Sequence, residues 1–156
     1  MTSIAMPLPI SGYASEIADS VDREIKKIRD MLQKSNALGI PAKVFQQLDD
    51  VFEACSSDGW DGEQAKPISG EVVRYVERFL NSLSGMEAPE VGAEPDGAIT
   101  LEWYRSPNKV ISISIDGSGW LYFAAIIGSR KRHGADFALL GVSDDLLDLI
   151  SQVTRR

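Results

Sequence analysis

Carboxylates gather around a tryptophan in residues 58–63, which read DGWDGE. Carboxylate groups bind cations or basic side chains, and a tryptophan can anchor a protein partner. The candidates for such a binding loop are Asp58, Trp60, Asp61 and Glu63. The segment lacks the alternating aspartates and the distal glutamate of an EF-hand, so calcium is a poor match and we assign no metal ligand.

The same loop also has a structural interpretation, which we favour. Gly59 and Gly62 permit backbone angles that are closed to other residues. Asp58 and Asp61 can accept hydrogen bonds from backbone N–H groups just ahead of them. Trp60 is then expected to be mostly buried against the helices, with its indole N–H donating to a backbone carbonyl. On this interpretation the loop fastens the fold rather than binding a ligand.

A second acidic candidate is Glu102, in the segment AITLEWY. It falls in the middle of a predicted strand, on the more polar face, where a carboxylate could act as a catalytic group. No second carboxylate, lysine or histidine stands at a motif spacing from it. We therefore expect Glu102 to be solvated or paired with an arginine.

Arg130, Lys131 and Arg132 form the one basic cluster and are followed by His133. We place the cluster at the exposed tip of a predicted hairpin, where charge keeps a sheet edge soluble. The alternative is a contact for phosphate or for an acidic surface, although three bases are few for nucleic-acid affinity. No Gly-rich phosphate-binding motif accompanies them.

Composition narrows the classes of function. A net charge of −7 and a pI of about 4.7 disfavour nucleic acid and favour a basic protein partner. The only cysteine, Cys55, excludes an intramolecular disulfide, and pairing it with the only histidine, His133, as nucleophile and base lacks any local signature. The N-terminus has no signal-peptide pattern, and no run of about 18 apolar residues occurs, so we expect a cytoplasmic protein without a membrane span.

Hydrophobic periodicity predicts helices in the N-terminal half. Apolar residues spaced by three and four recur over residues 14–32, again over 44–52 and again over 72–83. The first stripe also fits a heptad, so it is either a core-facing helix or a surface that pairs with another chain. Its candidate contact residues are Val21, Ile25, Ile28 and Leu32.

Beyond residue 97 the period changes to two, which is typical of half-buried strands. Four strands are predicted, over residues 98–104, 110–115, 120–127 and 135–140, followed by a helix that starts at Ser143. The fold is thus predicted as α+β: N-terminal helices (13–83), a connection (84–97), then a four-stranded antiparallel meander and a C-terminal helix (98–153). We expect a single domain over residues 1–156.

The segments GWDGEQAKPIS, PDGAITLEW and IDGSGWLYFA resemble a pattern found in uncharacterised small bacterial proteins with no known activity. The resemblance covers the chain from the Trp60 loop onwards and implies a bacterial, accessory protein. It supplies no catalytic residue.

From these features we expect a non-enzymatic protein–protein interaction module, such as an antitoxin, an immunity protein or an accessory subunit in bacteria. The partner we expect is either a second protein, for which a basic one fits the acidic charge, or another copy of the chain. The alternative is an enzyme, or a protein that binds a small ligand or a cation, that uses the acidic Trp60 loop or the strand face with Glu102. We assign no catalytic residue and no cofactor.

Overall fold

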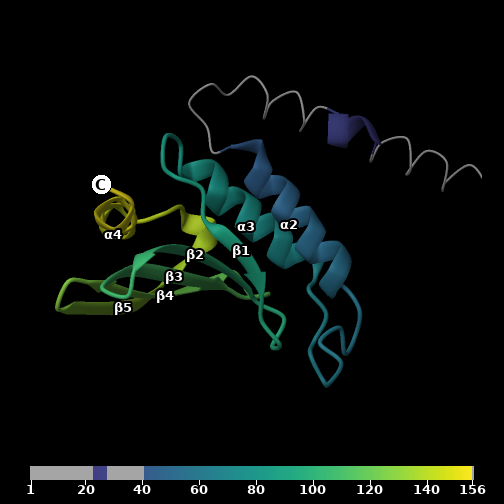
Figure 1. Ribbon diagram of the computed structural model, residues 1–156. Coiled ribbons are helices and arrows are strands. Elements are labelled where there is room, and N and C mark those ends of the chain that lie inside the picture. The colour runs from purple at the N-terminus through teal and green to yellow at the C-terminus, as the bar shows by residue number, and fades with distance from the viewer. Residues whose placement is uncertain (1–22, 28–40, 156) are drawn as a thin grey trace, which may run out of the picture. The chain divides into compact units, whose positions relative to one another are not determined.

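The computed structural model of the chain describes residues 23–27 and 41–155 (Figure 1). The chain divides into two compact units, Met1–Ala37 and Leu38–Arg156. In the first unit, residues 23–27 are helical and Ile25 is 49% exposed. Val21, Ile28 and Leu32 lie outside the described residues, so the predicted apolar stripe stays a prediction. The expectation of a single domain over residues 1–156 likewise remains a prediction.

Two helices precede the sheet, α2 (Ala42–Cys55) and α3 (Gly70–Ser82). The Ser69 side chain caps α3 by accepting a hydrogen bond from the Val72 N–H at 3.4 Å, which satisfies a backbone donor that the helix itself leaves unpaired. Gly85 follows α3 with a φ of 77°, a conformation that favours glycine. Both helices confirm the predicted apolar stripes.

The sheet has five antiparallel strands in the order β1-β2-β3-β4-β5, one more than predicted. The strands are β1 (Glu90–Ala93), β2 (Ile99–Ser106), β3 (Lys109–Ile115), β4 (Trp120–Ile127) and β5 (Arg130–Phe137). The additional strand, β1, lies inside the segment predicted as a connection. A tight turn joins it to β2, in which the Glu94 N–H donates to the Ala98 carbonyl at 2.9 Å and Gly97 has a φ of 93°. With four residues among prolines, glycines and acids, β1 has too little periodicity to be recognised alone.

The predicted position of the basic cluster at a hairpin tip is wrong, because Arg130, Lys131 and Arg132 lie inside β5. The turn between β4 and β5 consists only of Gly128 and Ser129, since Ile127 pairs directly with Arg130. Gly128 has a φ of 62°, which suits the first central position of a tight hairpin turn. The strand therefore begins five residues earlier than predicted, and four consecutive basic or histidine side chains alternate between its two faces.

A short 3-10 helix, η1 (Ala138–Leu140), leads to the C-terminal helix α4 (Asp144–Thr154). The predicted start is confirmed: the Ser143 hydroxyl accepts a hydrogen bond from the Leu146 N–H at 3.4 Å. Asp144 and Asp145 occupy the first turn, where negative charge complements the helix dipole.

The helices α2, α3 and α4 all lie on the same side of the sheet (Figure 1). The apolar residues of β2, β3 and β4 that face them are buried, in the alternating pattern that the sequence predicts. Side chains from the three helices and the sheet form one hydrophobic cluster. Its members with the least exposure include Leu48, Val76, Phe79, Leu80, Ile99, Leu101, Ile111, Ile113, Ile115, Leu121, Leu146 and Ile150.

Gly134 of β5 lies directly under an aromatic ring of the neighbouring strand. It pairs with Phe123, and a Cβ built on Gly134 would be 2.7 Å from Phe123 Cζ. We expect Gly134→Val to displace this ring and to lower the free energy of unfolding by about 1–3 kcal/mol, as overpacking does. Chemical denaturation measures the loss.

Two controls accompany this prediction. Gly92→Ala places a Cβ in open space on β1 and should change stability by less than about 0.5 kcal/mol. In a Phe123→Leu background, Gly134→Val should cost less than it does alone, because the ring is gone. Equal costs in both backgrounds would contradict the proposed clash.

Candidate interaction surface

The side of the sheet opposite the helices, which we call the open face, exposes three aromatic side chains. Tyr104 is 59% exposed, Tyr122 49% and Trp120 45%. They lie at alternate positions of β2 and β4, whose intervening residues point into the core. Trp120 makes an edge-to-face contact with Phe137, its cross-strand partner, with ring centroids 5.5 Å apart. From the strand pairing, the remaining side chains of this face are Glu90, Thr100, Glu102, Val110, Ser112, Ser114, Ala124, Ile126, Lys131, His133 and Ala135.

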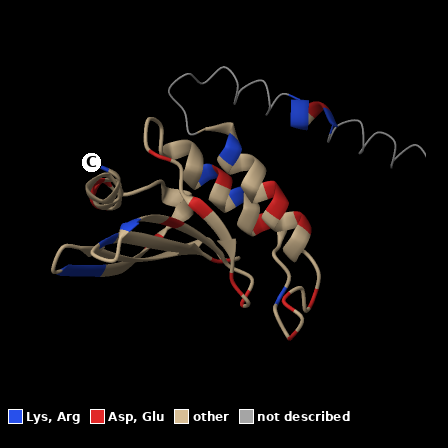
Figure 2. Cartoon of the chain, viewed as in Figure 1, with Lys and Arg blue, Asp and Glu red and all other residues tan. Residues whose placement is uncertain are grey.

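Charge on the open face is separated by strand. Glu90 on β1 pairs in register with Glu102 on β2, so two carboxylates stand side by side at one edge. Lys131 and His133 project from β5 at the opposite edge. Acidic residues colour β1 and the turn after it, and basic residues colour β5 (Figure 2). The face thus has an acidic edge, an aromatic and small-residue middle, and a basic edge.

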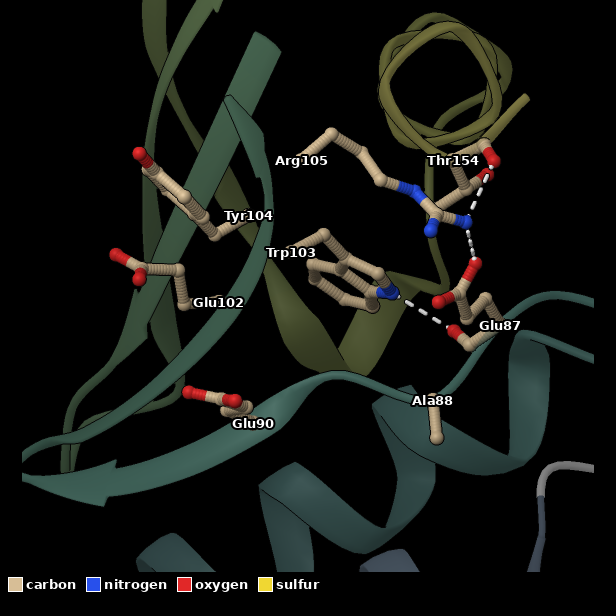
Figure 3. A pocket seen from close by; sticks show the side chains of 8 residues that line it. All are labelled: Glu87, Ala88, Glu90, Glu102, Trp103, Tyr104, Arg105 and Thr154. Atoms are coloured by element: carbon tan, nitrogen blue, oxygen red, sulfur yellow. Dashed lines mark hydrogen bonds and ion pairs between the residues drawn. The ribbon is translucent and has the colours of Figure 1, made fainter. Parts of the chain in front are cut away.

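A polar pocket of about 350 Å³ adjoins this face where β1 stops pairing with β2. Trp103 forms one wall, and its indole N–H donates to the Glu87 carbonyl oxygen at 2.7 Å. Arg105 forms an ion pair with the Glu87 carboxylate and donates to the Thr154 carbonyl oxygen at 3.1 Å. Figure 3 shows Trp103 and Arg105 directed towards α4 and Glu87, while Glu102 and Tyr104 point the opposite way.

The charged groups of this pocket are of two kinds, paired and unpaired. Arg105 and Glu87 already neutralise each other, so they hold the chain before β1 against β2 and α4. Glu90 and Glu102 have no hydrogen-bond or ion-pair partner among the described residues, and each lies beside the other's carboxylate. No group of three or more His, Cys, Asp or Glu side chains in residues 23–27 and 41–155 is arranged to hold a metal ion. The two carboxylates of Glu90 and Glu102 are therefore hydrogen-bond acceptors that the described residues leave unused.

The Trp60 loop has the contacts of the structural interpretation. The Trp60 indole N–H donates to the Lys66 carbonyl oxygen at 2.9 Å, which confirms the expected backbone partner. Asp61 accepts hydrogen bonds from the N–H groups of Glu63 and Ala65, at 2.9 and 3.2 Å. Trp60 packs against the core and is mostly but not fully buried, which confirms the expected position of its side chain.

Asp58 and Glu63 are exposed in the same loop. Unlike Asp61, neither side chain has a hydrogen-bond or ion-pair partner among the residues the structure describes. They do not lie with the glutamates of the pocket, whose lining contains no residue of the loop. The acidic candidates of the sequence thus fall into two separate places.

The basic cluster is divided by the alternation of β5. Lys131 and His133 lie on the open face, whereas Arg130 and Arg132 lie on the helix side. There the two arginines line a groove of about 100 Å³ with Asp145 and Asp148 of α4. A single phosphate-binding patch is therefore not formed by these residues.

Cys55 and His133 do not meet. Cys55 is buried at the end of α2, and burial raises the pKa of its thiol above the ordinary value. His133 is exposed on the open face. A nucleophile–base pair of these two residues is excluded by their positions on opposite sides of the sheet.

The aromatic residues of the open face are functional candidates that the sequence reasoning missed. Their signal was present in the segment WLYFAAII, where Trp120 and Tyr122 share one side of a period of two and Leu121 and Phe123 share the other. Only the packing of the helices decides which of these two sides is covered.

Comparison with known proteins adds no relative: the chain matches no family model, no curated protein and no solved structure. Among the residues that the structure describes, none of the helices has the length and apolar character needed to cross a membrane.

Proposed function

We propose that this chain is a protein-binding module that contacts its partner through the open face of the sheet. The observation that carries the proposal is the exposure of Tyr104, Trp120 and Tyr122 on one continuous strand surface. Tyrosine and tryptophan are enriched among the residues that dominate binding energy at protein interfaces. Apolar side chains, including Val110, Ala124 and Ile126, lie among these aromatic residues on the same face, and large exposed apolar patches mark interaction sites.

Binding of a protein fits the open face better than binding of a small molecule. A small-ligand site is concave and mostly apolar, with a few polar groups that orient the ligand. The pocket beside Glu102 is bordered instead by three glutamates and an arginine, and one of those glutamates is held by the arginine. The roles of an antitoxin, an immunity protein or an accessory subunit in a bacterium fall within this proposal, and the net charge of −7 favours a partner with basic groups.

The test compares partner capture by the full-length tagged chain with capture by the double variant Tyr104→Ser and Tyr122→Ser. Both side chains are about half exposed, so their replacement should leave the fold intact. We expect the double variant to recover at least one protein at least about tenfold less well than the wild-type chain does, which corresponds to about 1.4 kcal/mol. An untagged copy of the chain itself counts as such a protein.

Leu140→Ser is the matched control, because Leu140 is 84% exposed on η1 and lies outside the sheet. It should leave capture unchanged. If recovery instead survives loss of both tyrosines and depends on Asp58 and Glu63, the interface is the Trp60 loop and the proposal is wrong.

A further inference from the structure

We propose that the partner of the open face is a second copy of this chain, packed sheet against sheet about a two-fold axis parallel to the strands. This inference rests on the proposed function, because it uses the same face. Although each copy has a net charge of −7, the basic groups that the acidic edge requires are supplied locally by β5 of the second copy. It commits to a homodimer in which residues 90–137 of both copies form the interface.

The strand order allows this packing to be described in detail. With five strands, β3 lies in the middle of the sheet. A two-fold axis parallel to the strands reverses their order in the second copy. It therefore places β3 over β3, β2 over β4 and β1 over β5. Face-to-face sheets pack about 10 Å apart with strand directions within about 30° of each other, which preserves this correspondence approximately.

Charge selects this axis over the alternative. The reversed order sets Glu90 on the acidic edge over His133 on the basic edge of the second copy, with Lys131 in the next row of the same strand. An axis in the sheet plane but perpendicular to the strands would instead place β1 over β1, with carboxylates against carboxylates. Like charges facing each other at an interface are strongly unfavourable, so only the first arrangement is self-complementary.

The uncharged side chains are complementary under the same axis. Cross-strand pairing puts Tyr104 in one row with Val110 and Ile126, and Tyr122 in one row with Thr100 and Ser114. Exchange of β2 with β4 then sets Tyr104 against Ile126 and Tyr122 against Thr100 of the second copy. Large side chains meet smaller ones, which is the condition for two sheet faces to interdigitate.

The β5 edge of the sheet is poorly suited to forming the dimer by strand pairing. Pairing of β5 with β5 would bring together two strands that each carry Arg130, Lys131 and Arg132. Basic residues on an edge strand are a common device against such pairing. The open face has no such row of basic residues in its middle, since the central strand β3 contributes only Val110, Ser112 and Ser114 to it.

A charge-swap experiment on the full-length chain tests the proposal. His133→Glu and Glu90→Lys should each raise the dimer dissociation constant at least about tenfold, measured by sedimentation equilibrium, because these two residues share one row of the sheet and face each other across the axis. The double variant carrying both changes should bring it back to within about threefold of the wild-type value, because the pair is restored with reversed signs. Both positions are exposed and neither side chain has a partner among the described residues, so the monomer fold should be unaffected.

Lys43→Glu is the matched control for the change in net charge. Lys43 is exposed on α2, away from the open face, and its replacement should leave the dissociation constant unchanged. A second measurement is chemical cross-linking between copies. A short bis-maleimide should cross-link two copies of the Ser112→Cys variant, whose cysteine lies at the middle of β3, but not two copies of the Asn81→Cys variant, whose cysteine lies on α3. Cys55 is buried and contributes no background.

The results that would overturn the inference are distinct from those that would overturn the proposed function. A chain that stays monomeric at about 100 μM, well above the dissociation constants of stable homodimers, overturns the dimer. If such a monomer still captures another protein in a manner that depends on Tyr104 and Tyr122, the proposed function stands. A dimer abolished by Ile25→Glu but indifferent to His133→Glu would assign self-association to the N-terminal stripe and overturn the inference as well.

Discussion

Replacement of Trp103 by alanine is expected to lower the free energy of unfolding by about 3–5 kcal/mol, the usual cost of removing a buried aromatic side chain. Trp103 is 4% exposed and belongs to the main hydrophobic cluster. Its loss also frees the Glu87 carbonyl oxygen, which the indole N–H now satisfies at 2.7 Å. Chemical denaturation measures the loss. If the dependence of the unfolding free energy on denaturant concentration keeps the wild-type slope, the substitution has lowered stability without changing the cooperativity of unfolding.

Two substitutions separate the causes. Trp103→Phe keeps most of the packing and removes the N–H donor, so we expect a smaller loss of about 1–3 kcal/mol. Trp120→Ala removes the same type of side chain from a position that is 45% exposed on the open face. At protein concentrations too low for dimer formation, it should lower the free energy of unfolding by less than about 1 kcal/mol. If the Trp103 and Trp120 variants were equally unstable, the assignment of the two faces of β2 and β4 would be wrong.

The second large effect is expected at Trp60, where alanine should cost about 2–3 kcal/mol, somewhat below the range for fully buried aromatic residues. The sequence by itself predicts a loss of about 3–5 kcal/mol, the usual range for an aromatic residue. Its partial burial reduces the apolar area that is lost, but its hydrogen bond to the Lys66 carbonyl oxygen also disappears. Thermal and denaturant unfolding measure the change.

This substitution also distinguishes a fastening loop from a binding loop. Trp60→Phe should recover part of the stability, since it retains the ring against the core. Asp61→Ala should also be destabilising, because it removes the acceptor of two backbone N–H groups. A Trp60→Ala protein that unfolds like the wild type and yet loses a partner would show that the loop is an interaction site.

Much of the fold could be predicted from the sequence because it depends on local patterns. A stripe with spacings of three and four, a capping serine and a following glycine locate α3, and Ser143 with two aspartates locates the start of α4. Alternation of apolar and polar residues locates β2, β3 and β4 and assigns Trp103 and Glu102 to opposite faces. Each of these signals lies within one helical turn or one strand, so no distant residue is needed to read it.

The remaining strands are formed by pairing and have little local signal. The four residues of β1 are stable as a strand because β2 supplies their hydrogen-bond partners, from Glu90 opposite Glu102 to Ala93 opposite Ile99. The first half of β5 is basic and reads as a turn, but its pairing with β4 from Arg130 onwards makes it a strand. Backbone hydrogen bonds between strands do not depend on side-chain character, which is why polar or charged sequences can join a sheet edge.

The candidate surface was likewise decided by tertiary structure. The sequence determined that Trp120 and Tyr122 share one side of a strand and that Leu121 and Phe123 share the other. Burial of either side would satisfy the same pattern. Because α3 and α4 pack on the Leu121 side, the aromatic residues of the other side stay exposed, beside two carboxylates that only the register of β1 brings together. Side-chain alternation is a property of one strand, whereas the choice of the covered face depends on where the whole chain places its helices.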